Sequence, residues 1–367
     1  MESSLRIGKI MGIPIGINYS WFIVFALVTL SLATGYFPAR YPGWETAGYV
    51  TIAVVTSLLF FASVLAHELA HSAVALAWGV PVKSITLFIF GGVAHIAREP
   101  DRPLSEFLIA IAGPVSSLLL ALAFGAVWLG GEALELAPVA GLGLYLGAIN
   151  LSLAVFNMVP GFPLDGGRVF RSIIWGMTGN MNRATRWAAN AGRLMSVLMM
   201  LGGGVMFVMG NWTSGLWLGF IGWFLGNAAG QALSQVRVRE ALEGFTAGDF
   251  AGNLCQPVHS NLSLDWVVRD YVMPEGPNCF LVTDGAETEG VATLGQIRKV
   301  PRQAWGGTPI RQIMTPLSHI KPASAGEAAY DVLERMMEDG LSLLPVVDGS
   351  RMIGLVGRER LMQFAQK

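Results

Sequence analysis

The sequence has few charged residues and very little cysteine for its length. Of 367 residues, 13% are charged and 53% are hydrophobic, and the formal net charge is −1. This composition excludes a disordered tail and a highly charged nucleic-acid binder, so we expect no nucleic acid among the partners. The two cysteines, Cys255 and Cys279, suit neither a disulfide framework nor a cysteine-rich zinc site.

The few charges are unevenly distributed along the chain. Residues 1–235 contain 20 charged side chains, whereas the remaining 132 residues contain 29. A part of the chain in lipid and a part in water explain this difference in charge density better than a single environment does. The division predicts a membrane domain at 1–235, a linker at 236–245 and a soluble part from residue 246 onward.

The first 235 residues contain apolar segments that are long enough to cross a bilayer, which takes about 20 helical residues. Six such segments lie at 17–37, 47–78, 106–130, 139–158, 187–210 and 212–233. A shorter stretch at 85–94 is rich in β-branched and aromatic residues around Gly91 and Gly92. It predicts a short hairpin or re-entrant loop, which a membrane tolerates only when it is buried against protein. We therefore expect a polytopic α-helical membrane protein with six transmembrane helices and a short β-hairpin.

The basic residues between these segments indicate an orientation, because Lys and Arg in short loops favour the cytoplasmic side. The loops on the opposite side carry Arg40 alone and an acidic stretch at 131–138. We therefore predict a multi-pass protein of the cell membrane with both termini in the cytoplasm. The basic loops on the predicted cytoplasmic side contain Arg6, Lys9, Lys83, Arg98, Arg102, Arg168, Arg171, Arg183, Arg186, Arg237 and Arg239.

Three ionisable residues interrupt the second apolar segment, namely His67, Glu68 and His71. On a helix the two histidines, four residues apart, lie on one face, so both imidazoles can reach one zinc ion. Glu68 can then take a proton from a water molecule that the zinc activates. The alternative is a pair of structural histidines with Glu68 bonded to one of them. Three such residues are hard to accommodate in a membrane without a function, which favours the metal site.

A catalytic zinc site needs a third protein ligand, and Asp165 is the best candidate. The segment 157–168 contains two prolines and an Asp-Gly-Gly sequence, which cannot form a smooth helix. It therefore ends the fourth span and turns a carboxylate back toward the bundle. An ordinary turn aspartate is the alternative. His95 fits a loop histidine at the interface better, and His259 and His319 lie in the charged C-terminal part.

Together, the sequences His67-Glu-Leu-Ala-His71 and Asn157-Met-Val-Pro-Gly-Phe-Pro-Leu-Asp165-Gly-Gly resemble the two signature motifs of the site-2 proteases. These are zinc metalloproteases that cut peptide bonds within the membrane, and the resemblance covers the whole membrane domain. It implies that His67, His71 and Asp165 bind one Zn²⁺ and that Glu68 is the general base. It also implies that Asn157 helps to hold the substrate backbone or the oxyanion.

The same resemblance implies regulated intramembrane proteolysis of a single-span membrane protein within the lipid bilayer. A transmembrane substrate is helical, so its hydrolysis requires local unwinding beside an exposed strand edge. The segment 90–92, Phe-Gly-Gly, resembles the membrane-embedded hairpin that presents such an edge. A membrane transporter or channel is the alternative function, but it would place carboxylates and carbonyls along a pathway at mid-membrane. Imidazoles with an adjacent base favour the protease.

The C-terminal part contains two copies of a β-α-β-β-α pattern, at 246–305 and 306–367. The second copy is the clearer one, with an amphipathic helix at 325–339 and strands at 343–347 and 352–356. The pattern resembles a pair of cystathionine-beta-synthase (CBS) domains, which are regulatory modules. A cytoplasmic regulatory domain is therefore expected to follow the membrane domain.

CBS pairs often bind adenine nucleotides, with a Thr or Ser and an Asp three residues later holding the ribose. In this sequence the corresponding positions are Thr293 with Gln296 and Gly357 with Arg360. Because both copies lack the aspartate, two functions other than nucleotide binding remain open for the CBS pair. These are a sensor of another ligand and a module for homodimerisation.

Overall fold

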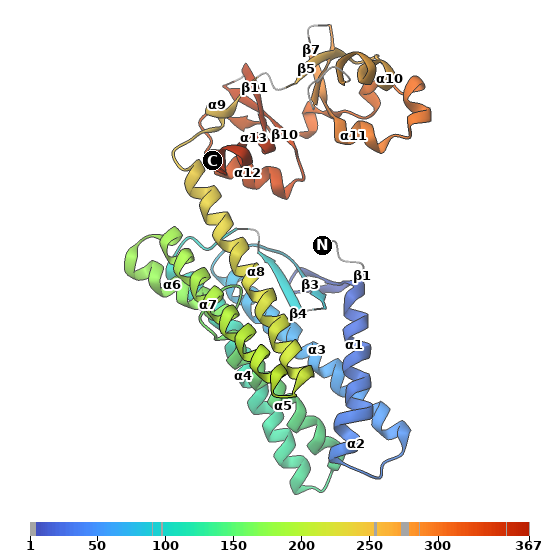
Figure 1. The fold of residues 1–367 in the computed structure, drawn as a ribbon, viewed down its shortest axis with the longest axis vertical. Helices are drawn as coiled ribbons and strands as arrows, with labels where there is room; N and C mark the ends of the chain where they lie inside the picture. Colours follow the sequence, from blue (N-terminus) through green and yellow to red (C-terminus); the bar gives the residue numbers. More distant parts are fainter. Residues whose placement is uncertain are drawn as a thin grey trace. The chain divides into compact units, whose positions relative to one another are not determined.

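The computed structural model describes residues 5–89, 91–96, 98–252, 255–272, 279–285, 287–349 and 351–366 (Figure 1). The chain forms two compact units, with the division between Leu233 and Ser234. This division falls inside a long helix, α8 (Trp212–Leu242). Each unit has hydrophobic clusters of its own.

Long apolar helices dominate the first unit. In the described part of the chain, five segments are long and apolar enough to cross a membrane, and they match five of the six predicted spans. The first of them consists of α1 (Tyr19–Ser31), a short helix at Leu32–Tyr36 and α2 (Phe37–Arg40). The other four are α3 (Thr46–Ala77), α4 (Pro103–Ala133), α5 (Ala137–Asn157) and α7 (Met181–Val208).

The sixth predicted span is not confirmed. Residues 212–233 are helical as the first part of α8, but α8 is not among the five segments that are apolar enough to cross a membrane. Tryptophan, glycine and Asn227 lower its hydropathy, and Arg237 and Arg239 follow in the same helix. The prediction of a polytopic helical protein holds, whereas the count of six does not follow from the structure.

A four-stranded sheet accompanies these helices. The strands follow the order β1-β2-β3-β4, with β2 parallel to β3 and the other pairs antiparallel. The predicted hairpin at 85–94 is confirmed as β3 and β4, and the predicted contribution of Phe90 lies outside the described residues. The two N-terminal strands were not predicted, because only tertiary structure brings them beside β3. The strands are β1 (Leu5–Ile10), β2 (Ile13–Ile17), β3 (Val82–Phe88) and β4 (Gly91–Ile96).

Asp165 begins a helix, α6 (Asp165–Thr178), although the sequence predicted only a turn at this position. The preceding segment, 158–164, packs tightly because glycines line its contacts. A Cβ added to Gly192 on α7 would lie 2.2 Å from the Phe162 carbonyl oxygen, and one added to Gly167 would lie 2.4 Å from Gly161. These contacts leave no room for side chains, so they determine where the first turn of α6 can lie.

The second unit contains two sheets with the predicted β-α-β-β-α order in each half. The first sheet has the order β5-β6-β7-β8 and the second has the order β11-β10-β9. In the first half, the helix predicted near 263–272 is divided into α10 (Leu264–Val267) and a π-helical turn at Val268–Val272. The strands are β5 (Gln256–His259), β6 (Cys279–Asp284), β7 (Glu287–Thr293), β8 (Thr315–Pro316), β9 (Ala323–Ser324), β10 (Leu343–Asp348) and β11 (Arg351–Gly357). The remaining α-helices are α9 (Ala247–Phe250), α11 (Leu294–Lys299), α12 (Ala329–Glu338) and α13 (Arg358–Ala365).

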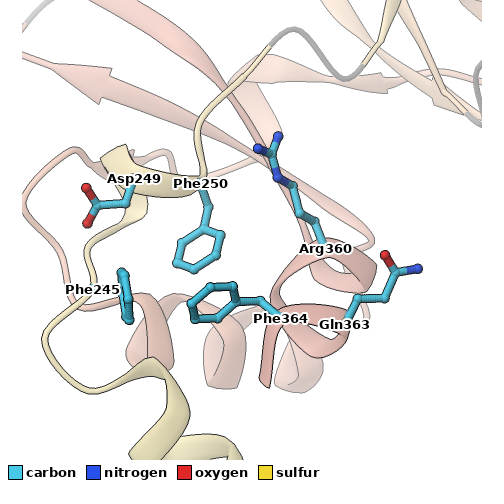
Figure 2. A pocket seen from close by; sticks show the side chains of 6 residues that line it. All are labelled: Phe245, Asp249, Phe250, Arg360, Gln363 and Phe364. Atoms are coloured by element: carbon cyan, nitrogen blue, oxygen red, sulfur yellow. The ribbon is translucent and has the colours of Figure 1, made fainter. Parts of the chain in front are cut away.

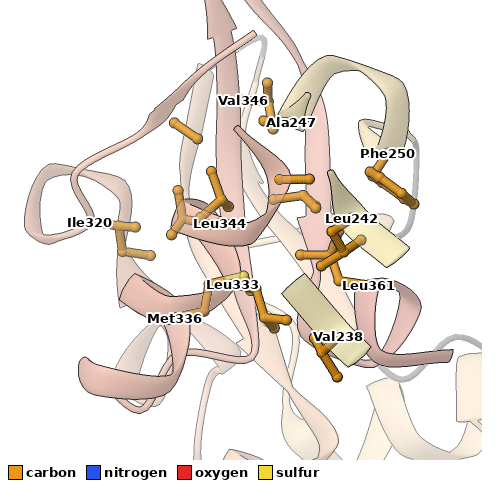
Figure 3. Close-up of a cluster of buried hydrophobic side chains, with 14 residues drawn as sticks. Val238, Leu242, Ala247, Phe250, Ile320, Leu333, Met336, Leu344, Val346 and Leu361 are labelled. Atoms are coloured by element: carbon orange, nitrogen blue, oxygen red, sulfur yellow. The ribbon is translucent and has the colours of Figure 1, made fainter. Parts of the chain in front are cut away.

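The larger core of the second unit includes the end of α8 (Figure 3). Val238 and Leu242 pack with Leu333 and Met336 of α12 and with Leu344 of β10 in one buried cluster. Residues 236–242 of the predicted linker are therefore helical, and two of their side chains belong to this core.

The two cysteines, for which the sequence indicated neither a disulfide framework nor a zinc site, are bonded to each other as Cys255–Cys279. β5 and β6 are parallel neighbours with Gln256 opposite Phe280. This register places residues 255 and 279 side by side, with their Cα atoms 4.8 Å apart, although they are 24 positions apart in sequence. The sequence pattern contains no sign of that strand pairing.

We expect Gly192→Ala to destabilise the first unit, because its Cβ would collide with the Phe162 carbonyl and displace the segment before α6. Overpacking of this kind costs about 1–3 kcal/mol. The matched control is Gly204→Ala in the same helix, where an added Cβ meets nothing within 4 Å. Thermal unfolding of the full chain in detergent measures both variants. Equal transition temperatures for the two would contradict the close packing at Gly192.

Candidate metal centre

Three side chains from two helices converge inside the first unit. His67 and His71 lie on α3, and Asp165 is the first residue of α6. Their ligand atoms form a nearly equilateral triangle: each Nε2 lies 3.1 or 3.2 Å from Asp165 Oδ2, and the two Nε2 atoms lie 3.2 Å apart. Both histidines are 4% exposed. The structure thus brings together the three residues that were predicted as ligands from the sequence.

This triangle has the dimensions of one face of a tetrahedral zinc site. Zinc bonds of 2.0–2.1 Å to nitrogen and oxygen place neighbouring ligand atoms about 3.3 Å apart. In the described ranges, no other set of three or more His, Cys, Asp and Glu side chains is close enough to hold a metal ion. Three ligands on one face also leave a fourth position for a water molecule or a substrate.

The carboxylate of the group is in the state that a metal ligand requires. Burial raises the pKa of the Asp165 carboxyl, but the imidazoles of His67 and His71 outweigh this effect and hold the pKa well below its usual range. Asp165 is therefore ionised at neutral pH and can only accept hydrogen bonds or bind a cation.

The far nitrogens of both imidazoles are held by α4. His71 Nδ1 donates a hydrogen bond of 2.6 Å to the Ile109 carbonyl. A carbonyl only accepts, so Nδ1 carries a proton, and Nε2 is the nitrogen whose lone pair becomes available to a metal ion once its own proton is lost. His67 Nδ1 lies 2.8 Å from the Ser117 hydroxyl. Both rings are thus oriented with Nε2 toward the centre.

Gly113 lies between these two partners on α4 and makes space for the imidazoles. A Cβ at this position would lie 2.2 Å from His71 Nε2 and 2.6 Å from His67 Nε2. Ile109, Gly113 and Ser117 are spaced four residues apart, so they form one stripe along the helix. These three residues were not predicted from the sequence. A glycine and a serine four positions apart on an apolar span were the available signal, and the pattern is common in membrane helices.

Glu68 lies outside the ligand triangle and faces the sheet. A Cβ added to Gly92 of β4 would lie 2.5 Å from Glu68 Cγ and 3.3 Å from its Oε1. The backbone of Ala94, on the same strand, is a hydrogen-bond partner of the Glu68 carboxylate. The carboxylate therefore lies between the histidines of α3 and the backbone of β4, which is an edge strand of the sheet.

The other sequence candidates have different surroundings. Asn157 is the last residue of α5 and is half-buried, at the start of the segment that leads to Asp165. The exposed side chain of His95 lies on β4 and is not in the metal group. His259 belongs to the second unit, where its Nε2 lies 3.6 Å from Asp284. The side chain of His319 lies outside the described part of the chain.

Comparison with known proteins identifies the family. The model of Peptidase family M50 matches residues 55–136 and 126–201. A putative zinc metalloprotease of Synechocystis sp. is 37% identical over 100% of this chain and 96% of its own length. The putative zinc metalloprotease Rip3 of Mycobacterium tuberculosis is 33% identical over 97% of this chain and 91% of its own. The chain belongs to Peptidase family M50. This membership confirms the predicted site-2 protease family and the predicted metalloprotease class. The apolar helices agree with a multi-pass membrane protein. The relatives do not favour the alternative of a transporter.

Solved structures similar to this member of family M50 divide between the two units. The site-2 protease from Methanocaldococcus jannaschii is 28% identical and covers 62% of this chain and 94% of its own, with a TM-score of 0.40. The CBS domain of a bacterial CNNM/CorC family Mg²⁺ transporter in complex with ATP is 15% identical. It covers 37% of this chain and 97% of its own, with a TM-score of 0.31.

We expect Ser117→Ala to weaken metal binding, because the His67 ring loses the partner that orients it. Removing such a partner lowers metal affinity about 10- to 100-fold. The matched control is Ser116→Ala, whose hydroxyl donates to the Gly113 carbonyl of its own helix. Competition with a zinc chelator measures the affinity of both purified variants. An unchanged affinity in Ser117→Ala would show that the hydroxyl does not orient the ring.

Proposed function

We propose that the protein is an intramembrane zinc endopeptidase that hydrolyses a peptide bond in the transmembrane segment of a single-span membrane protein. The observation that carries this proposal is the triangle of His67, His71 and Asp165, which is built on a 32-residue apolar helix beside a strand edge. A metal site on such a helix would lie within the bilayer, where substrates that are themselves membrane-embedded have their scissile bonds. The family membership of the chain supports the reaction class.

In this proposal, His67, His71 and Asp165 hold one Zn²⁺. When bound, the zinc acidifies a water molecule and polarises the carbonyl of the scissile bond. Two neutral imidazoles and one carboxylate reduce the net charge of the bound ion to about +1, which limits the cost of its burial. Ile109 and Ser117 keep both imidazoles in the orientation for binding.

Glu68 acts as the general base and takes the proton from the attacking water. It follows the first ligand directly, and its carboxylate lies against Gly92. The absence of a side chain at Gly92 lets the Glu68 carboxylate lie directly against β4, the strand with which a substrate backbone would pair. An unwound substrate segment would pair with the edge of β4. This pairing would supply the hydrogen bonds that the substrate backbone cannot obtain from water in the bilayer. Asn157 would bind the substrate backbone or the oxyanion.

We further propose that the protein resides in the cell membrane with both termini in the cytoplasm. The distribution of Lys and Arg between the apolar segments supports this orientation. Water access and product release would then be on the cytoplasmic side. In a reducing cytoplasm the Cys255–Cys279 bond would be transient.

We expect Glu68→Gln to abolish cleavage of a model transmembrane substrate while zinc stays bound, because the amide cannot accept a proton but retains the shape of the side chain. The loss should be at least about 100-fold, the usual contribution of a general base. Cleavage in detergent or vesicles and zinc content per chain are measured on the same preparation.

Asp165→Ala is the comparison variant, and it should lower both the zinc content and the cleavage rate. Wild-type cleavage by Glu68→Gln would remove Glu68 as the base. Full zinc occupancy in Asp165→Ala would remove Asp165 from the ligands. A comparison of membrane proteins from wild-type and Glu68→Gln cells then identifies the substrate as the protein that stays uncut.

We propose that the second unit, a pair of CBS-like repeats, regulates the protease and binds an adenine nucleotide. In the first repeat, the ribose positions are already engaged with each other. Thr293 N donates to Gln296 Oε1 at 2.8 Å, and Gln296 Nε2 donates to the Thr315 hydroxyl at 2.9 Å. This pair caps α11, so the first repeat has no free group for a ribose at this position.

The surface at α9 and α13 offers a better location. A hollow of about 310 Å³ is lined by Phe245, Asp249, Phe250, Arg360, Gln363 and Phe364 (Figure 2). The three phenylalanine rings form one cluster with centroids 4.9–5.8 Å apart. A base could stack on this surface, and the guanidinium of Arg360 could pair with a phosphate. The departure from the usual aspartate therefore suits an anionic group better than a ribose hydroxyl.

We expect ATP to bind the full chain with measurable heat in a calorimeter and to bind Arg360→Ala at least about tenfold more weakly. Arg351→Ala, an exposed arginine of β11 that does not line the hollow, is the control and should bind as the wild type does. No heat change at millimolar ATP would exclude the nucleotide. Size-exclusion chromatography of the full chain then tests the remaining alternative, a module for homodimerisation.

A further inference from the structure

A buried arginine outside the metal triangle contacts three parts of the first unit at once. Arg171 of α6 donates from Nε to Glu106 Oε1 of α4 at 2.6 Å, and its NH2 group pairs with the same carboxylate. Its NH1 group donates to Glu99 Oε1 at 3.1 Å. The guanidinium also lies over the ring of Phe162, 5.2 Å from its centroid.

Because these groups are buried, each charge depends on its partner in this contact. Glu106 is fully buried and Arg171 is 7% exposed, whereas the side chain of Glu99 is half-exposed. A buried charge is tolerated only with a partner, so Arg171 and Glu106 depend on each other. The planar guanidinium can serve two carboxylates and an aromatic face together, which a lysine ammonium cannot do in the same geometry.

The three contacts join the two halves of the proposed metal site. One half is α4, whose Ile109 and Ser117 orient the imidazoles, and Glu106 lies one turn before Ile109 on that helix. The other half is α6 with its preceding segment, which carries Asp165 at its first residue and Phe162 just before it. Arg171 holds these halves in register, while neither Arg171 nor Glu106 belongs to the metal group itself.

We infer that Arg171, paired with Glu106, is a positioning residue that places Asp165 against the two histidines. This inference rests on the proposed function, because it assigns Arg171 a role at the ligand that Asp165 provides. A purely stabilising ion pair is the alternative. The two roles differ in what happens when both charges are removed together, since replacing a whole buried pair is often neutral for stability.

The test compares zinc affinity and folding in the full chain purified in detergent. Arg171→Met removes the guanidinium and leaves Glu106 buried without its hydrogen-bonded partner, so this variant is also expected to destabilise the fold. The double variant Glu106→Gln/Arg171→Met removes both charges, and Arg171→Lys keeps the charge but not the three-way contact. Arg98→Met is the matched control, because Arg98 forms an exposed pair with Asp101 at 3.5 Å. Chelator competition gives the zinc affinity, and thermal unfolding without zinc gives the stability.

We expect the double variant and Arg171→Lys to bind zinc about 10- to 100-fold more weakly than the wild type, the usual effect of disturbing the support of a metal ligand. Their unfolding temperatures without zinc should stay close to that of the wild type, and Arg98→Met should match the wild type in both measurements. Wild-type zinc affinity in the double variant and in Arg171→Lys would overturn the positioning role.

Asp165→Ala, measured alongside, separates the two possible failures. If it loses zinc affinity while the Arg171 variants keep theirs, the positioning role is wrong and the proposed metal site stands. If Asp165→Ala itself binds zinc as the wild type does, the proposed ligand set is wrong, and the positioning role is overturned with it.

Discussion

Two imidazoles inside an apolar helix impose the constraint on which the rest of the first unit depends. Each buried ring nitrogen must find a partner, since an unsatisfied polar group in such surroundings costs several kcal/mol. The Ile109 carbonyl and the Ser117 hydroxyl of α4 take the Nδ1 atoms, and this leaves both Nε2 atoms facing Asp165. Because α4 must approach α3 this closely, the position opposite the rings can only be a glycine, Gly113. The packing of α3 against α4 and the geometry of the metal triangle are therefore one feature.

The same close packing extends to the carboxylates around the site. Asp165 reaches the histidines because glycines in the segment before α6 and at Gly192 permit backbone contacts that any side chain would prevent. Glu68 faces the other way, toward Gly92 of β4, so the proposed base lies between the metal ligands and an open strand edge. This arrangement brings the groups that a peptide hydrolase needs within one small volume: a metal position, a base and a place for an extended backbone.

The sequence predicted the proposed metal ligands and the base, but not the residues that hold them in place. His67, Glu68, His71 and Asp165 could be predicted from local pattern. The two histidines have helical spacing, charged residues are scarce in apolar spans, and Asp165 stands in a Pro- and Gly-rich break. The structure brings His67, His71 and Asp165 together as expected. Gly113, Ser117 and Arg171 were not found, since glycine, serine and arginine have many other uses and each acts here through a residue distant in sequence. The sixth span is not confirmed, because α8 is long and helical but is not among the five described segments that are apolar enough to cross a membrane.

By itself the sequence determined the features that depend on local pattern: the length of the apolar helices, the pair of histidines on one helical face, the β3–β4 hairpin and the β-α-β-β-α order of the second unit. Only the tertiary structure decided which distant segments meet. The contact of His67 with Ser117 joins residues 50 positions apart, and that with Asp165 joins residues 98 apart. The pairing of Cys255 with Cys279 likewise follows from the register of two parallel strands. Such contacts depend on how whole elements pack, and the spacing of residues within one element contains no information about them.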